Sequence, residues 1–155
     1  MRILAVCAGN ICRSPAAEAA LIEAAAEAGF AVEVDSAGTG SWHIGQPPHA
    51  ESVAAGARGG LLIQGRARKV TASDFDRFEI IVAMDRANLR DLIALAPSKE
   101  AQAKVRLFRT YDPEATIDEV PDPWGGPDAG YEETIRIVRA AARGLVAEIA
   151  EHSRP

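Results

Sequence analysis

The stretch RILAVCAGNICRSPAAEAALIEAAAEAG, residues 2–29, joins two kinds of sequence through a short polar loop. Its apolar start, residues 2–7, is typical of a buried strand, and its alanine-rich end predicts a helix that stops before Gly29. Ser14 suits the N-cap of that helix, and Pro15 suits its first position. The stretch therefore predicts a strand, a loop and a helix, which is the repeating unit of α/β folds.

The same order of elements recurs along the rest of the chain. Further strands are predicted over residues 31–35, 79–84 and 105–108, and further helices over residues 48–58, 85–96 and beyond the long loop 110–130. Strands that alternate with helices form parallel sheets. We therefore predict an α/β fold, a single-domain three-layer sandwich with a four-stranded parallel sheet and helices on both faces. The loops that follow the strands meet at one edge of such a sheet, where α/β proteins bind ligands. These loops begin at Cys7, Ser36, Asp85 and Thr110.

The composition and net charge of the chain exclude several classes of protein. The chain has 155 residues, of which 48% are hydrophobic and 25% charged, which fits one ordinary domain over residues 1–155. Its formal net charge of −5 argues against a nucleic-acid module, because phosphate-backbone binding needs a concentrated basic face. We expect no membrane span and no signal peptide, since no apolar run is long enough. Two cysteines are too few to crosslink a secreted fold, so we expect free thiols and a cytoplasmic location.

The first loop is suited to bind an anion. Several backbone N–H groups point inward at a helix N-terminus, and Gly9 and Asn10 tolerate the positive φ that such a turn requires. Arg13 adds a planar fork of donors that matches two oxygens of a phosphate. Cys7 begins the loop in positive potential, which favours a thiolate. We therefore predict that Cys7 is a nucleophile placed for in-line attack on phosphorus. The predicted phosphate-binding residues are Ala8, Gly9, Asn10, Ile11, Cys12 and Ser14.

The two cysteines have other possible roles. A buried cysteine at a strand end is often only a packing residue, but packing does not require the arginine downstream. Cys12 is either a packing residue or a second thiol that traps oxidised Cys7 as a disulfide. Nucleotide P-loops need a Gly-Lys pair, thioredoxin-type chemistry needs C-x-x-C, and zinc needs four suitably spaced ligands. The sequence has none of these patterns, so we predict no metal and no cofactor, and local hydrogen bonds for the histidines.

A phosphatase also needs an acid to protonate the leaving group, and the long loop offers two candidates. Asp112 and Asp122 each precede a proline. Asp122 is favoured because prolines stiffen it on both sides and because Trp124 is placed to shield it from water. The alternative for each aspartate is ordinary turn chemistry.

The chain resembles the low-molecular-weight protein tyrosine phosphatase family. The resemblance rests on VCAGNICRSP, DSAGTGSWHIGQPP, ARKVTASDFDRFEIIVAMDRANLRDL and VPDPWGG, which together span nearly the whole chain. It implies a four-stranded parallel sheet and metal-free hydrolysis of a phosphotyrosyl protein or small aryl phosphate, with inorganic phosphate as product. The roles that it implies are a nucleophile (Cys7), a phosphate-binding arginine (Arg13), a group that stabilises the thiolate (Ser14), a general acid and base (Asp122), two loop braces (Asn10, Ser36) and an aromatic cleft wall (Trp42).

Two features depart from the family pattern. Relatives commonly have a histidine in the bracing network where this chain has the segment 64–68, Gln-Gly-Arg-Ala-Arg. The usual pair of tyrosines after Asp-Pro is replaced by Trp124 and Gly125, which changes the rim of the cleft. Trp42, Trp124 and Tyr131 are candidates to grip a phosphotyrosyl ring or a partner, or are local packing residues.

Three alternative functions remain open at this stage. A phosphoarginine phosphatase of the same fold would resemble this motif with threonine in place of Ile11, which favours aryl phosphates instead. An arsenate reductase would need resolving cysteines after Cys12, and the chain has none there. A non-catalytic phosphate-binding module would use the same loop without turnover.

Overall fold

Four strands form one parallel sheet in the computed structural model, which describes residues 1–153. The strands are β1 (Arg2–Cys7), β2 (Glu33–Gly38), β3 (Ile80–Ala83) and β4 (Val105–Leu107). They lie in the order β2-β1-β3-β4, and every neighbouring pair is parallel. The chain therefore runs from β1 to β2 on one side of it, and then crosses back to β3 on the other side of β1. Such a switch point opens a crevice beyond the carboxyl ends of β1 and β3.

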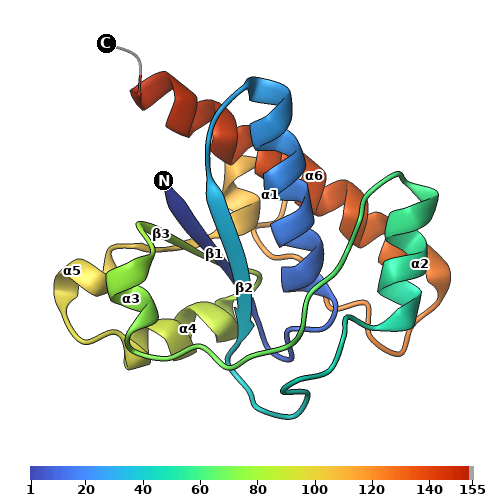
Figure 1. Cartoon of the computed structure of the whole chain (residues 1–155), viewed down its shortest axis with the longest axis horizontal. Coiled ribbons are helices and arrows are strands. Elements are labelled where there is room, and N and C mark those ends of the chain that lie inside the picture. Colours follow the sequence, from blue (N-terminus) through green and yellow to red (C-terminus); the bar gives the residue numbers. More distant parts are fainter. Residues whose placement is uncertain (154–155) are drawn as a thin grey trace.

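Helices cover both faces of this sheet (Figure 1). The helices are α1 (Arg13–Ala28), α2 (Ala50–Arg58), α3 (Asp74–Arg77), α4 (Arg86–Leu95), α5 (Lys99–Gln102) and α6 (Asp128–His152), with a 3-10 helix, η1 (Phe108–Tyr111). Helices α1, α2 and α6 contribute to one core, and α3, α4 and α5 to the other. Alternate residues of β1 pack into the two cores: Ile3 and Ala5 into one, and Leu4 and Val6 into the other. The predicted three-layer α/β fold is confirmed.

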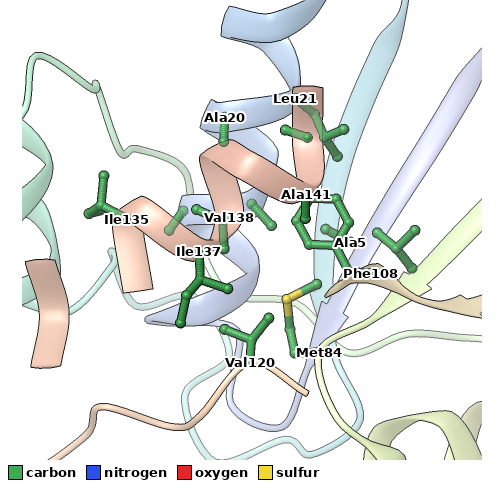
Figure 2. Close-up of a cluster of buried hydrophobic side chains, with 14 of the residues drawn as sticks. Ala5, Ala20, Leu21, Met84, Phe108, Val120, Ile135, Ile137, Val138 and Ala141 are labelled. Atoms are coloured by element: carbon green, nitrogen blue, oxygen red, sulfur yellow. The ribbon is translucent and has the colours of Figure 1, made fainter. Parts of the chain in front are cut away.

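The larger core anchors the loop that precedes α6. Figure 2 shows Ala20 of α1 and Ala141 of α6 where the two helices cross, and these small side chains let the helices pack closely. In the same view Val120 lies beside Met84 at the end of β3. Val120 is fully buried, and its N–H donates to the carbonyl of Met84 at 2.7 Å. This anchor fixes the start of the segment that carries Asp122.

One predicted helix cap is wrong. Ser14 was expected to cap α1, but the N-cap is Cys12 and no side chain caps the helix. Ser14 lies within the first turn, where its hydroxyl contacts the sulfur of Cys7. The Ser14 hydroxyl therefore binds a side chain of the loop instead of capping the helix.

Some element boundaries also differ from those predicted. The second strand runs over Glu33–Gly38 instead of residues 31–35, because Ser36, Ala37 and Gly38 continue the pairing with the end of β1. The elements α3, α5 and η1 were not predicted. Each has four residues, which is too short to show a helical pattern of apolar positions.

Candidate active site

The loop that joins β1 to α1 forms one wall of a pocket of about 220 Å³. The pocket is lined by Cys7, Ala8, Gly9, Ile11, Cys12, Arg13, Trp42, His43, Asp122 and Trp124. It lies where β1 ends, at the crevice that the strand order predicts. Within residues 1–153, the N–H groups of Gly9, Ile11 and Cys12 donate to no protein acceptor. They are free to bind an anion.

Two donors converge on the sulfur of Cys7. The backbone N–H of Asn10 donates to it at 3.2 Å, and the hydroxyl of Ser14 lies 3.0 Å away. Because the Ser14 oxygen already accepts from the Asn10 side chain at 2.8 Å, its own proton is free for the sulfur. The other acceptor within reach of that hydroxyl, the carbonyl of Ala37, is farther away at 3.4 Å. Both donors stabilise negative charge on the sulfur.

Asn10 braces the loop from its centre. Its backbone is in the left-handed region with φ of 57°, which asparagine tolerates better than most residues. Its side-chain N–H groups donate to the hydroxyls of Ser14 at 2.8 Å and Ser36 at 3.0 Å. Its side-chain oxygen accepts the backbone N–H of Arg68 at 3.0 Å. The segment that lacks the family histidine thus supports Asn10 through a main-chain amide.

The guanidinium of Arg13 is buried beside the pocket and held by groups from two other segments. One terminal nitrogen donates to the carboxylate of Asp85 at 2.7 Å and to the carbonyl of Val120 at 3.1 Å. Burial works to lower the pKa of Arg13, but the Cys7 sulfur and the Asp85 carboxylate outweigh it and raise the pKa above its ordinary value. Arg13 therefore stays charged, with its second terminal nitrogen directed toward Asp122, 4.0 Å away.

Asp85 belongs to the site, although the sequence predicts for it only a helix cap and a place in a loop at the sheet edge. It does cap α4, because one of its oxygens accepts the N–H of Asn88 at 2.8 Å. Its other oxygen holds Arg13. The signal in the sequence is its position two residues after the end of β3, at the same sheet edge as Cys7.

The two candidate acids lie in different places. Asp122 lines the pocket with Cys7, whereas Asp112 lies in another hollow and accepts the N–H of Glu114 at 2.9 Å. Asp122 accepts the N–H of Trp124 at 3.1 Å, which holds its carboxylate in a turn. The expected shielding by Trp124 is absent, because the Asp122 side chain is 56% exposed and Trp124 itself 61% exposed.

Cys12 is chemically different from Cys7. Burial, followed by the negative charges of Cys7 and Asp122, raises the pKa of Cys12 to about 12. It therefore remains a thiol at neutral pH, in which form it is a poor nucleophile. Both cysteines are free in this structure.

The rim of the pocket is aromatic and exposed. Trp42 is 70% exposed, and His43 beside it was not predicted as a site residue. The His43 ring lies so close to Gly9 that a Cβ there would be 3.0 Å from it. Tyr131, in contrast, does not reach the rim, since it is buried and stacks on His49 with 5.8 Å between ring centroids. Of the two roles open to Tyr131, the structure therefore supports local packing.

Two further properties concern the described part of the chain as a whole. Residues 1–153 contain no group of three or more histidine, cysteine, aspartate or glutamate side chains arranged to hold a metal ion. None of the helices in this range combines the length and the apolar character that a membrane crossing requires.

Known proteins are similar to this chain in sequence and in fold. The sequence model of the low molecular weight phosphotyrosine protein phosphatase family matches residues 2–154. A low molecular weight protein-tyrosine-phosphatase of Streptomyces coelicolor is 44% identical over 154 residues, which cover 97% of this chain and 94% of that protein. The human low molecular weight phosphotyrosine protein phosphatase is 37% identical over 145 residues, or 89% and 91% of the two chains. The crystal structure of a protein tyrosine phosphatase from Entamoeba histolytica superimposes with a TM-score of 0.95 at 33% identity, covering 99% of each chain. The chain therefore belongs to the low molecular weight phosphotyrosine protein phosphatase family and is an enzyme of the protein-tyrosine-phosphatase type.

Proposed function

We propose that this chain hydrolyses phosphotyrosine and small aryl phosphates in two steps, with Cys7 as nucleophile and Asp122 as general acid and base. The observation that carries the proposal is the arrangement around the Cys7 sulfur. Two hydrogen-bond donors face the sulfur, and Arg13 and Asp122 line the same pocket. A packing cysteine has no need of such an arrangement.

In the first step, the Cys7 thiolate attacks phosphorus in line with the leaving phenolic oxygen. The S–P bond forms as the P–O bond breaks, and protonated Asp122 gives its proton to that oxygen. Arg13 and the free N–H groups of the loop stabilise the charge on the equatorial oxygens. Asp85 supports this step because it fixes the orientation of the guanidinium.

In the second step, water hydrolyses the phosphocysteine. Ionised Asp122 takes a proton from the water, the oxygen of that water bonds to phosphorus, and the S–P bond breaks. The products are inorganic phosphate and the Cys7 thiolate. Since Asp122 is exposed to solvent, it can meet both the leaving group and the incoming water.

The walls of the pocket favour an aryl substrate. The two exposed indoles of Trp42 and Trp124 offer surfaces on which a phenyl ring can pack. Ile11, an apolar residue of the loop, also lines the pocket and suits an aryl phosphate better than phosphoarginine. A reductase role is disfavoured because no cysteine follows Cys12.

We propose that residues 1–155 act as one phosphatase domain on a phosphotyrosyl protein, and that the site needs no metal or cofactor. A reduced Cys7 is essential to the mechanism, which supports a cytoplasmic setting, where thiols stay reduced. The net charge of −5 supports a partner other than nucleic acid.

The decisive test is turnover of p-nitrophenyl phosphate in the presence of a chelator. We expect turnover by the unaltered chain and a loss of more than about 1,000-fold in Cys7→Ser, because an alcohol is a much weaker nucleophile than a thiolate. Binding of inorganic phosphate, measured by calorimetry, should persist in Cys7→Ser and show that the loop is intact. Phosphate binding without turnover by the unaltered chain would establish a non-catalytic module instead.

The role of Asp122 is tested with leaving groups of different basicity. We expect Asp122→Asn to slow phenyl phosphate by roughly 100-fold or more, since phenolate needs a proton to leave. The nitrophenyl ester should be slowed far less. Asp112→Asn is the matched control and should leave both rates within about twofold. Equal slowing of the two esters by Asp122→Asn would contradict the assignment of Asp122 as the acid.

A further inference from the structure

Two arginines bind consecutive carbonyl groups of the chain just before the proposed acid, Asp122. Arg13 donates to the carbonyl of Val120 at 3.1 Å. One residue earlier, a terminal nitrogen of Arg109 in η1 donates to the carbonyl of Glu119 at 2.9 Å. Arg13 lines the phosphate pocket, whereas Arg109 does not line it and takes part in no step of the proposed reaction.

Arg109 and Glu119 each lie next to a residue that is anchored in the larger core. Phe108 precedes Arg109 and is fully buried, and Val120, which follows Glu119, is also fully buried. Figure 2 shows both of these side chains in the core. The hydrogen bond from Arg109 therefore fixes the peptide group of Glu119 to a rigid part of the fold.

The loop between Arg109 and Glu119 has little other support for its main chain. Most of its residues are exposed, including Pro113, Glu114, Thr116 and Ile117. Near the end of the loop, Arg86 of α4 binds the carboxylate of Asp118 through its side chain and that of Glu119 through its N–H at 2.8 Å. Those contacts reach the loop through its side chains, whereas Arg109 holds the main chain directly.

Stability does not explain why an arginine is buried at position 109. The residue is 9% exposed, and within residues 1–153 its Nε has no hydrogen-bond partner. Burying a charged group with incomplete hydrogen bonds costs free energy, and apolar side chains of similar size often replace such groups without loss. Acidic residues in the adjacent hollow, Asp112, Asp118 and Glu119, offset part of this cost. The arginine therefore has a task other than packing.

We propose that Arg109 is a positioning residue, which holds the carbonyl of Glu119 so that Asp122 stays within reach of the leaving group. Asp122 lies three positions after Glu119, between Pro121 and Pro123. Since prolines restrict backbone rotation, the orientation that is set at Glu119 is carried to Asp122 through stiff chain. A general acid must lie within hydrogen-bond distance of the oxygen that it protonates, so a small displacement of this segment is costly. The inference deepens the proposed phosphatase function and rests on it.

The test compares Arg109→Met with the unaltered chain on two esters that differ in their leaving group. Methionine fills much of the same space and removes the donor. We expect kcat/KM for phenyl phosphate to fall by about 10-fold, because phenolate needs the proton of Asp122. The p-nitrophenyl ester should be slowed by less than about twofold, because its leaving group depends little on the acid. The affinity for inorganic phosphate should not change, since Arg109 does not line the pocket.

Arg106→Met is the matched control for the loss of an arginine. Arg106 lies on β4, three positions before Arg109, and is exposed. It donates to the hydroxyl of Tyr111 and holds no part of the segment that leads to Asp122. Both esters should therefore be hydrolysed at unchanged rates by Arg106→Met.

The Asp122→Asn background shows whether Arg109 acts through Asp122. There, Arg109→Met should change kcat/KM for either ester by less than about twofold, because the acid that it positions is gone. Equal slowing of the two esters by Arg109→Met in the native background would reveal a general structural effect and overturn the proposal. A 10-fold loss that persists in Asp122→Asn would also overturn it. Thermal melting of each variant verifies that it is folded.

A second measurement is independent of turnover. Amide hydrogen exchange at Val120, whose N–H donates to the carbonyl of Met84, reports how firmly the segment is held. We expect this exchange to be about fivefold faster in Arg109→Met and unchanged in Arg106→Met, while the amides of β1 keep their rates. Failure of the proposed function would remove turnover by the unaltered chain and leave the effect on exchange. Failure of the Arg109 proposal would leave turnover and remove both the ester selectivity and the effect on exchange.

Discussion

Asp85 shows how one side chain can serve the fold and the site at once. One carboxylate oxygen caps α4 through the N–H of Asn88, and the other holds the buried guanidinium of Arg13. Arg13 is 4% exposed, so water cannot replace a lost partner there. The pair keeps the guanidinium in the pocket that Cys7 lines, with its orientation fixed before substrate binds.

At this residue scale, Asp85→Asn separates the two tasks. Its amide oxygen can still cap α4, while its NH₂ group would face Arg13 as donor against donor. We expect kcat/KM for p-nitrophenyl phosphate to fall by about 10- to 100-fold and the affinity for inorganic phosphate to weaken. Asp91→Asn, an exposed change on the same helix, is the control and should have little effect. A kcat/KM within twofold of the unaltered chain would show that Asp85 does not position Arg13.

At the scale of elements, the contact between α6 and η1 depends on a glycine inside a helix. Glycine is unfavourable there for helix formation, and the sequence alone gives no reason for Gly144. In the structure, a Cβ at this position would lie 1.8 Å from the carbonyl oxygen of Tyr111. The close approach of two backbones explains the glycine.

Gly144→Ala should therefore push η1 away from α6. We expect it to lower the free energy of unfolding by about 2–3 kcal/mol, measured by urea denaturation, because the clash is with backbone that cannot rotate away. Gly130→Ala in the same helix is a matched control, since its Cβ would meet Pro123 at an ordinary 3.8 Å. That change should be neutral or stabilising by about 0.5–1 kcal/mol. Equal effects of the two substitutions would contradict the close contact.

At the scale of the whole molecule, Glu18 adds a pH-dependent contribution to stability. Burial raises its pKa to about 7 in the folded chain, against an ordinary value of 4.5, so the folded state binds the proton more tightly than the unfolded state. The contribution is fully present below about pH 4.5 and is lost as pH rises through about 7. Glu18→Gln removes this loss. We expect the variant to melt about 3 °C higher than the unaltered chain at pH 8 but not at pH 4.5, by calorimetry. An identical difference at both pH values would disprove the linkage.

Much of the architecture could be predicted because its signals are local. The apolar run before Cys7, the alanine-rich stretch after Pro15 and the capping aspartate at position 85 each lie within a few consecutive residues. The predictions failed where a local preference competes with a distant contact. Ser14 has the chemistry of a helix cap, yet its hydroxyl is drawn to the Cys7 sulfur instead.

The amino-acid order by itself determined the alternation of strands and helices and the residue types of the nucleophile loop, since both depend on neighbours along the chain. Only the tertiary structure decided that Asp85 holds Arg13, that the Arg68 amide supports Asn10, and that Asp122 lines the same pocket as Cys7 whereas Asp112 does not. These contacts join residues that are 72 and 58 positions apart for the first two pairs. They form because parallel strands bring their following loops to one edge, and no short stretch of sequence records which side chains then touch.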